Sequence, residues 1–246
     1  MNRTLRIATF NIHKGVTSFN ARLVLHEQRE LIRRMQADIV FLQEVRGEHA
    51  RHRPLFNGAQ HEYLADSVWD DFAYGKNAIY PAGHHGNALL SKYPILTWEN
   101  QDISAHTAEQ RGMLHCEIAI PSWNHPLHCI CVHLGLFARW RRQQLFALRS
   151  RIESLVPADA PLIIAGDFND WRMKAGRILA DRLDLKEVFE CCEGRPARSF
   201  PSLLPLFRLD RIYVRGFHVQ QAQVHRGATI AKISDHAALS AVMTRL

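Results

Sequence analysis

Short apolar runs that end in polar residues recur along this chain, and they constrain its fold more than any other feature. In the clearest case, residues 162–165 are apolar, Gly166 follows, and Asp167 and Asn169 then stand two residues apart. Such a run, bounded by turn-forming residues, is typical of a buried strand. Although Gly-Asp-x-Asn also describes ordinary turns, alternation along an extended chain predicts that Asp167 and Asn169 project to the same side beyond the strand end. Ligands often bind where central strands of an α/β sheet end, so this is the first candidate site.

The same pattern predicts most of the other strands. Residues 5–11 alternate apolar and polar side chains and end in Asn11, and the almost wholly apolar residues 38–44 end in Glu44. The further strands predicted in this way are residues 86–91, 110–120, 126–134, 208–214, 217–224 and 237–242.

Residues 138–156 form the clearest predicted helix, because leucine and isoleucine recur there at spacings of three and four. Five arginines cover much of the rest of this helix, a pattern more typical of a solvated face than of a nucleic-acid footprint. Further helices are expected at residues 20–36, with Asn20 as the N-cap, and at residues 175–185. Residues 46–85 are expected to be an irregular, substrate-facing insertion that carries its own aromatic side chains.

Composition limits the class of protein. A length of 246 residues with no linker-like segment predicts one domain, and 47% hydrophobic and 22% charged residues are typical of a soluble globular protein. The five cysteines form neither a disulfide framework nor a zinc spacing, so we expect reduced core thiols. The chain shows neither a secretory signal nor a membrane-spanning stretch, which predicts a cytoplasmic protein. The net charge of +7 favours anionic partners, although a generally solvated basic surface explains it equally well.

Nine polar side chains lie at or near the ends of the predicted strands. They are Asn11, Glu44, Asn87, His133, Asp167, Asn169, Asp210, Asp235 and His236. Oxygen ligands with few carboxylates suit Mg²⁺, with Mn²⁺ as a substitute, whereas a zinc site would show more His or Cys at ligand spacing. Singly, each residue also has a structural interpretation, in which Asn11 forms a turn, Glu44 lies on the surface and His133 fills the core. The site hypothesis therefore depends on all nine together.

Seven short motifs contain these residues. They are Thr9-Phe10-Asn11-Ile12-His13, Gln43-Glu44-Val45, Gly86-Asn87-Ala88-Leu89-Leu90-Ser91, His133-Leu134, Gly166-Asp167-Phe168-Asn169, Leu209-Asp210-Arg211-Ile212 and Ser234-Asp235-His236. In this order, and over nearly the whole chain, they resemble the motifs of the endonuclease/exonuclease/phosphatase superfamily, also called DNase I-like. The run Gly-His-His-Gly-Asn-Ala at residues 83–88 resembles a group of compact, uncharacterised bacterial members.

The resemblance implies both a fold and a metal site. The fold would be a four-layered α/β sandwich, in which two mixed β-sheets pack face to face with helices outside. The activity would be metal-dependent hydrolysis of a phosphoester. Glu44 would be the principal metal ligand, with help from Asn11 and, as a further candidate, from Asp235. Asn87 would bind the substrate.

The resemblance also implies catalytic roles. Asp167 and Asn169 would position the attacking water and the phosphate oxygens. His236 would be the general base or would hold the scissile phosphate, with Asp210 fixing its tautomer, and His133 would be a phosphate contact or a general acid. The chemistry itself asks for these groups, because phosphoryl transfer needs a neutralised phosphate charge, an oriented water and a proton acceptor.

The sequence leaves the substrate open. A phospholipid is favoured if exposed aromatic side chains meet an anionic membrane surface, although core packing explains the same residues; they are Trp69, Phe72, Trp98, Trp123 and Phe137. The net charge and the arginine-rich helix favour nucleic acid instead. A third interpretation is a binding scaffold that has lost its chemistry, against which the intact polar set argues. No obligate protein partner is evident.

Overall fold

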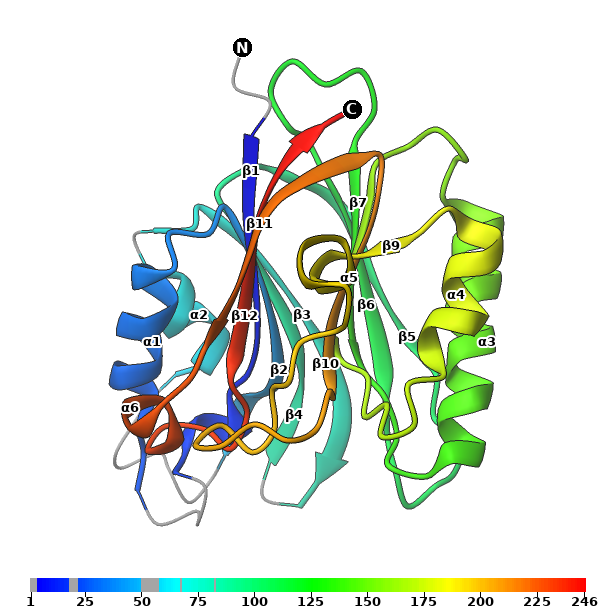
Figure 1. Cartoon of the computed structure of the whole chain (residues 1–246). Coiled ribbons are helices and arrows are strands. Elements are labelled where there is room, and N and C mark those ends of the chain that lie inside the picture. Colours follow the sequence, from blue (N-terminus) through cyan, green and yellow to red (C-terminus); the bar gives the residue numbers. More distant parts are fainter. Residues whose placement is uncertain (1–3, 18–21, 50–57, 67, 82) are drawn as a thin grey trace.

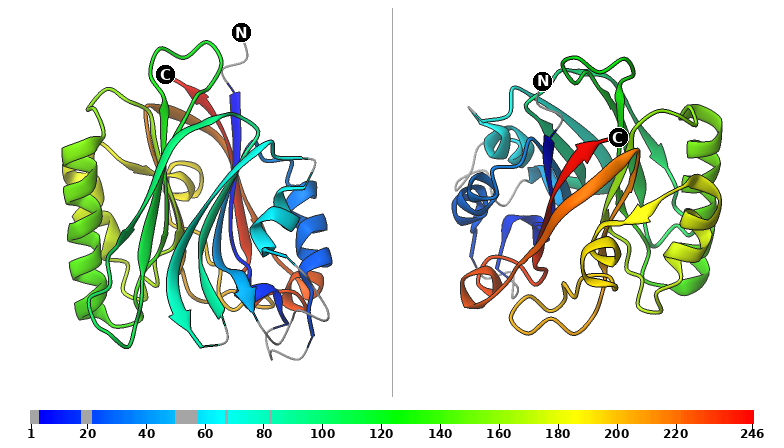
Figure 2. Two further views of the ribbon diagram at one scale, coloured as in Figure 1. Left: turned by 180° about the vertical axis from the view of Figure 1, so that it is seen from behind. Right: turned by 45° about the horizontal axis from the view of Figure 1, so that its top comes forward.

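Two six-stranded β-sheets pack face to face, and helices cover the outer face of each (Figures 1 and 2). The computed structural model describes residues 4–17, 22–49, 58–66, 68–81 and 83–246. The four layers confirm the α/β sandwich that the resemblance implies.

The first sheet has the strand order β11-β12-β1-β2-β4-β3. At its centre β1 and β2 run parallel, while the neighbouring pairs are antiparallel, so the sheet is mixed. Its strands are β1 (Thr4–Asn11), β2 (Ile39–His49), β3 (Asp71–Tyr80), β4 (Gly83–Ser91), β11 (Phe217–His225) and β12 (Ala238–Arg245).

The second sheet has the order β5-β6-β7-β8-β10-β9. It is mixed in the same way, with β7 and β8 parallel at its centre and antiparallel pairs around them. Its strands are β5 (Ile95–Asp102), β6 (Gly112–Ile118), β7 (Leu127–His133), β8 (Leu162–Asp167), β9 (Lys186–Glu187) and β10 (Asp210–Arg215).

Helices α1 (Leu25–Arg34) and α2 (Gln60–Ala65) lie against the first sheet, and α3 (Ala138–Leu155) and α4 (Ala175–Leu183) against the second (Figure 1). The short elements are η1 (His13–Gly15), α5 (Val188–Glu193) and α6 (Ala228–Ala231). No helix in the described part of the chain combines the length and the apolar character that a membrane crossing requires.

The alternation of side chains along each central strand builds three apolar layers. In β8, Ile163 and Ala165 point into the core between the sheets, while Leu162 and Ile164 pack against the helices of the second sheet. In β1, Ile7 points into the inter-sheet core. Apolar residues on both faces explain why these strands read as nearly continuous hydrophobic runs.

Two expectations are corrected by the structure. The described parts of residues 46–85 are not irregular, because β3 pairs with β4 and α2 packs beside β2. Glycine and polar residues within β3 obscured its alternation. The first helix begins at Leu25, with Val24 in the N-cap position, rather than near residue 20. Asn20 itself lies outside the described residues.

Helix α3 has the predicted bounds but a different buried face. Arg141 and Arg151 are buried and Leu155 is exposed, so the arginines do not form one solvated face. Arg141 is buried because its Nη1 atom donates to the carbonyl oxygens of Gly135 and Leu136.

The prediction for the cysteines is half right. All five are free and Cys116, Cys129 and Cys131 are buried, but Cys191 and Cys192 are exposed on α5.

Candidate active site

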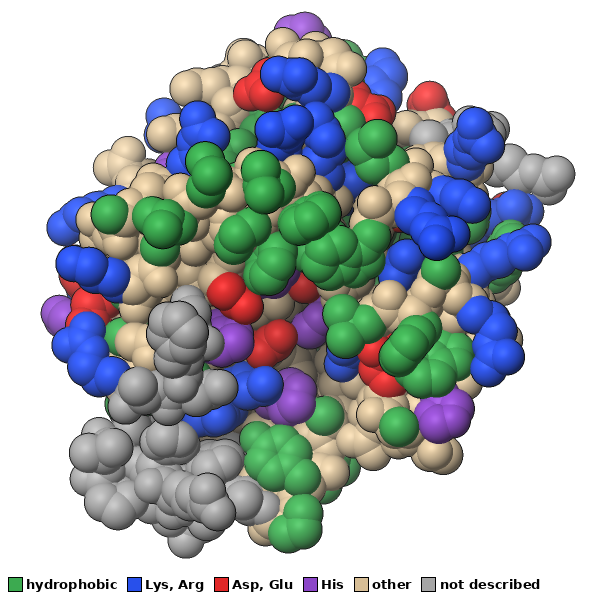
Figure 3. Space-filling model, turned by 60° about the horizontal axis from the view of Figure 1, so that its bottom comes forward, with side chains coloured by type: hydrophobic (Ala, Val, Ile, Leu, Met, Phe, Trp, Pro, Cys, Tyr) green, Lys and Arg blue, Asp and Glu red, His purple; other side chains and the backbone are tan. Residues whose placement is uncertain are grey.

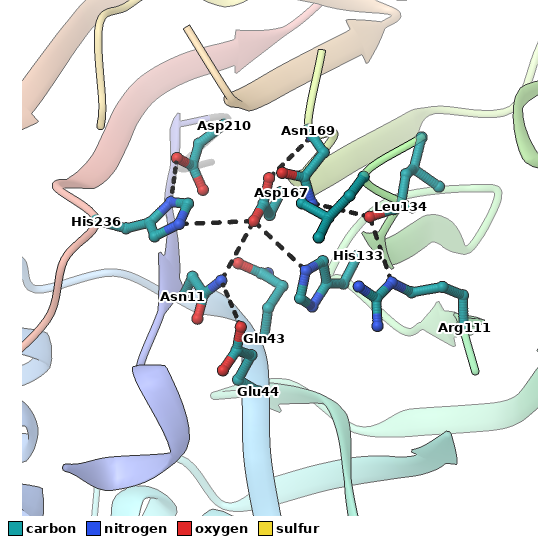
Figure 4. Close-up of polar contacts among 12 residues, drawn as sticks. Asn11, Gln43, Glu44, Arg111, His133, Leu134, Asp167, Asn169, Asp210 and His236 are labelled. Carbon is teal, nitrogen blue, oxygen red and sulfur yellow. Dashed lines mark hydrogen bonds and ion pairs between the residues drawn. The ribbon is translucent and has the colours of Figure 1, made fainter. Parts of the chain in front are cut away.

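The two central parallel strand pairs end side by side and bring the predicted site together. Asn11 at the end of β1 is paired with Gln43 of β2, and His133 at the end of β7 is paired with Asp167 of β8. Gly166 allows β8 to approach β7 closely, because a Cβ atom there would lie 2.0 Å from the carbonyl oxygen of Val132. Polar side chains from both sheets therefore converge at one end of the sandwich (Figure 4).

Asp167 is the centre of the site and is buried. Its Oδ2 atom accepts a hydrogen bond from Asn11 Nδ2 at 3.2 Å and lies 3.5 Å from His133 Nε2 and 3.7 Å from His236 Nε2 (Figure 4). Its Oδ1 atom accepts from the backbone N–H of Asn169 at 2.9 Å. Burial raises the pKa of Asp167 to about 6, although the nearby His236 works against this rise.

His236 and Asp210 form a buried pair in which His236 Nδ1 lies 2.8 Å from Asp210 Oδ2. A carboxylate can only accept, so Nδ1 carries the hydrogen and Nε2 faces Asp167. Burial alone would lower the pKa of His236, but the carboxylates of Asp210 and Asp167 outweigh it and raise that pKa to about 10. Ser234 holds the segment in place, since its hydroxyl donates to the carbonyl oxygen of Asn11 and accepts from the backbone N–H of His236.

Glu44 stands on the other side of Asn11. Its backbone lies in the left-handed region at φ 56°, within an irregularity of the pairing between β2 and β4. Such a conformation in a residue other than glycine costs about 1–3 kcal/mol and is concentrated at functional sites. Glu44 Oε1 accepts from Asn11 Nδ2 at 3.4 Å, and Glu44 Oε2 lies 3.5 Å from Lys14 Nζ. Burial opposes the ionisation of Glu44, but Lys14 and His13 outweigh it and lower the pKa.

The carboxylates of Glu44 and Asp235 fit a hard divalent cation. Glu44 Oε2 and Asp235 Oδ1 are buried and accept no hydrogen bond, although each faces a cationic or imidazole side chain. Oxygen donors of this kind are the ligands that such cations prefer. Asn11 fits less directly, because its Oδ1 atom accepts from the backbone N–H of His13 and its amino group faces Glu44. Its side chain would have to turn over to offer an oxygen.

A second arrangement could also hold a metal ion. Asp167, Asp210 and His236 offer ligand atoms that all lie within 4.8 Å of one another. Among the described residues, this is the cluster of His, Cys, Asp or Glu side chains that is compact enough to hold an ion. However, the hydrogen bond from His236 Nδ1 to Asp210 already places a proton between two of them. This proton makes the trio less suited to a cation than the unpaired oxygens of Glu44 and Asp235.

The two remaining predicted residues, Asn87 and Asn169, have structural contacts as well. Asn87 joins the two sheets, because its Nδ2 atom donates to the carbonyl oxygens of Gly112 and Cys131, while its Oδ1 atom is buried without a partner. Asn169 does not meet Asp167 through strand alternation. Strand β8 ends at Asp167, and the backbone of Asn169 is left-handed at φ 47°. The two residues therefore meet through a turn, in which the backbone N–H of Asn169 donates to Asp167 Oδ1.

The site also includes residues that the sequence interpretation missed. His13 and Lys14 follow Asn11 and face Asp235 and Glu44, with His13 Nδ1 3.2 Å from Asp235 Oδ1. Their position directly after a strand end was the available signal. Arg111, at the edge of β6, donates through Nε to the carbonyl oxygen of Leu134 at 3.3 Å. Burial and then the charge of Arg111 hold the pKa of His133 well below its usual range.

The aromatic residues proposed to meet a membrane surface have no common position. Trp69 is buried and donates from Nε1 to the carbonyl oxygen of Ala37, and Trp123 packs against Phe217. Phe72, Trp98 and Phe137 are exposed, but they belong to β3, β5 and the turn before α3. This set therefore gives no support to a membrane-facing surface.

Comparison with known proteins agrees with the motifs. The model of the Endonuclease/Exonuclease/phosphatase family matches residues 8–236. The uncharacterized protein YbhP of Escherichia coli (strain K12) is 48% identical over 243 residues, which cover 97% of this chain and 95% of that protein.

Solved structures agree at the level of the fold. The structure of D. rerio TDP2 complexed with single strand DNA product has a TM-score of 0.72 at 18% identity, covering 99% of this chain and 100% of that one. The mannosyl-6-phosphatase Bt3783 of Bacteroides thetaiotaomicron VPI-5482 has a TM-score of 0.71 at 16% identity, covering 98% and 99%. These values show a shared fold, and the motif-based resemblance is confirmed.

Proposed function

We propose, on the premise that this chain belongs to the endonuclease/exonuclease/phosphatase family, that it is a Mg²⁺-dependent phosphodiesterase. Enzymes of the family are hydrolases that act on phosphoester bonds. The observation that carries the proposal is the buried hydrogen bond between His236 and Asp210, aimed at the central carboxylate of Asp167. A structural role explains poorly why three ionisable groups are buried together at the ends of central strands.

Asp167 would orient the attacking water and accept its proton. It is ionised at neutral pH because its pKa lies at about 6, and this raised value makes it a better acceptor than an ordinary aspartate. The backbone N–H of Asn169 holds its Oδ1 atom in a fixed direction, and in the metal-free protein the amide of Asn11 holds its Oδ2 atom. The Oδ1 atom of Asn169 stays free to orient the water, since its Nδ2 atom donates to the carbonyl oxygen of Leu134.

His236 would bind the scissile phosphate as an imidazolium. Asp210 holds the proton on Nδ1, so the Nε2–H group can donate to a phosphate oxygen. Charge fixed in this way stabilises the transition state without reorganisation during the reaction. His133 would be the second phosphate contact and, because its pKa is low, a neutral hydrogen-bond partner.

Glu44 would be the principal ligand of the cation, with Asp235 and a turned Asn11 as further oxygen donors. When bound, Mg²⁺ or Mn²⁺ would neutralise phosphate charge as a Lewis acid. Lys14, 3.5 Å from Glu44 Oε2, supplies positive charge at the same position in the metal-free protein.

A nuclease is the second candidate function. Two observations favour it: the net charge of +7, and the likeness to D. rerio TDP2, whose structure holds a single strand DNA product. The fold alone does not choose the substrate, because a mannosyl-6-phosphatase shares it. A catalytically silent scaffold is disfavoured by the complete polar set.

The test is hydrolysis of a soluble aryl phosphodiester by wild type, Glu44→Ala and His236→Ala, with Mg²⁺, with Mn²⁺ and with chelator. We expect metal-dependent turnover by wild type and loss of most activity in both folded variants. An aryl phosphomonoester, assayed alongside, separates the diesterase from a phosphatase. Near-wild-type turnover by either variant would refute the assignment, and a folded wild type that neither turns over nor binds metal would be a scaffold.

A further inference from the structure

An apolar rim borders the His236 side of the site. It consists of Trp171, Met173, Leu203, Leu204, Leu206 and Phe207, whose exposed fractions range from 41% to 68%. The two segments that form the rim are in contact, since the rings of Trp171 and Phe207 lie 4.9 Å apart. Single exposed apolar side chains need no explanation, but a contiguous patch marks an interaction surface.

The rim is fixed to the site. Phe200 lies between them, with its ring centre 6.1 Å from that of Trp171 and 5.0 Å from that of His236. The backbone N–H of Ser202 donates to the carbonyl oxygen of Asp235, and the hydroxyl of Ser202 donates to the carbonyl oxygen of Ser234. Anything that covers the rim is therefore held against the entrance of the site. Figure 3 shows a band of hydrophobic side chains beside the hollow in which acidic and histidine side chains gather.

An arginine pocket adjoins the rim. This cavity of about 560 Å³ is lined by Arg195, Arg198, Arg208 and Arg226, and by Leu204 and Leu206 of the rim. Glu193 is the single carboxylate in its lining. In the described part of the chain, none of the four arginines forms an ion pair with a carboxylate.

The arginine pocket therefore has an excess of positive charge. Partial burial and the positive charges of Arg198 and Arg195 lower the pKa of Arg208, as expected for cations that face one another. Guanidinium groups with free donors bind phosphate well, often through two parallel hydrogen bonds. The pocket is thus suited to phosphate groups outside the candidate active site.

The combination favours an anionic lipid surface over a nucleic acid. Nucleic acid would use the arginines, but single strands also need aromatic faces for base stacking, and four of the six rim residues are not aromatic. Aliphatic side chains instead gain from burial among acyl chains, while neighbouring arginines contact the headgroups. Arginine and leucine side chains share one cavity lining, so both contacts can form at once.

We propose that the apolar rim and the arginine pocket together dock the protein on an anionic phospholipid bilayer, with the candidate active site facing the headgroup layer. The surface differs from the aromatic residues considered in the sequence, because none of those belongs to it. That a headgroup phosphodiester is then the substrate rests on the proposed function. The docking itself does not.

Co-sedimentation with vesicles tests the proposal. Wild type should bind phosphatidylcholine vesicles that contain phosphatidylglycerol, and bind neutral phosphatidylcholine vesicles much more weakly. Leu204→Glu should weaken binding about tenfold and Arg198→Glu about fivefold. The matched controls Leu96→Glu on β5 and Arg142→Glu on α3 are both exposed and belong to neither the rim nor the arginine pocket, so they should bind like wild type.

Three results would overturn the docking surface. The first is equal binding to neutral and anionic vesicles, and the second is equal weakening of binding by the control variants. The third is that the protein binds single-stranded DNA but no vesicles, and that the rim and pocket variants abolish the DNA binding. Circular dichroism of each variant confirms folding. Turnover of the soluble aryl diester separates the two proposals. Vesicle binding without turnover would refute the proposed function alone, and turnover without vesicle binding would refute the docking surface alone.

Discussion

Two buried histidine clusters show how the partner of an imidazole sets its charge. At the site, His236 Nδ1 lies 2.8 Å from the carboxylate of Asp210, and the pKa of His236 is raised to about 10. Beneath α3, Arg151 Nε donates to His115 Nδ1 at 3.1 Å, and burial together with this cation lowers the pKa of His115 to about 4. Both rings are buried, so burial does not explain the difference.

The second cluster is a structural network. Because Arg151 can only donate, His115 Nδ1 must accept, and the hydrogen of the neutral ring lies on Nε2, which faces His128 Nδ1 at 3.0 Å. Arg151 also pairs with Glu99 at 2.8 Å. The network ties α3 to β5, β6 and β7 with every proton position fixed. An ionisable cluster thus suits catalysis when it includes carboxylates that face an open site, and suits architecture when its charge is satisfied internally.

The largest expected effect is on activity. Asp210→Asn keeps the size of the side chain but removes the charge that holds a proton on His236, so we expect kcat/KM for the aryl diester to fall about 10³-fold. His115→Ala, in the second cluster, should leave kcat/KM unchanged. Equal losses in the two variants would mean that the clusters do not differ in function.

The reverse pattern is expected for stability. Arg151→Met removes the donor to His115 and leaves buried polar groups without a partner, which should lower the free energy of unfolding by about 2 kcal/mol. Arg149→Met, on the same helix, loses an exposed pair with Glu153 and should cost about 0.5 kcal/mol or less. Urea unfolding measures both. A loss for Arg149→Met as large as that for Arg151→Met would argue against a structural network.

A further prediction concerns the pH dependence of stability. The pKa of His236 is raised from 6.5 to about 10 on folding, so its proton-linked contribution to stability is complete below the lower value and is lost as the pH rises through the higher one. The stability advantage of metal-free wild type over Asp210→Asn should therefore shrink between these two pKa values. Urea unfolding across that pH range measures the difference. An advantage that grows with pH would have the wrong sign.

Much of the fold and the site follows from local patterns. The apolar runs that end in Asn11 and Asp167 predict central strands, and the ends of parallel neighbours must meet, so both residues could be assigned to one site. Glu44 could be assigned for the same reason, although its left-handed backbone could not be foreseen.

What the sequence did not reveal depends on partners far along the chain. Strand β3 owes its extended form to pairing with β4, which outweighs its weak alternation. Arg151 reads as a surface residue until β5 and β6 supply its acceptors. The apolar rim escaped notice because its two segments are separated by 30 residues or more and meet through tertiary contacts such as that of Trp171 with Phe207.

The most direct test of the account is the protonation state of these two rings, measured by NMR on metal-free protein with labelled histidines. The chain has 15 histidines, so the spectra of His236→Ala and His115→Ala assign the two signals. We predict that at about pH 7.5 His236 is an imidazolium and His115 is neutral. In Asp210→Asn the titration of His236 should move to lower pH. A neutral His236 at that pH in the wild type would contradict the claim that Asp210 holds it charged for phosphate binding.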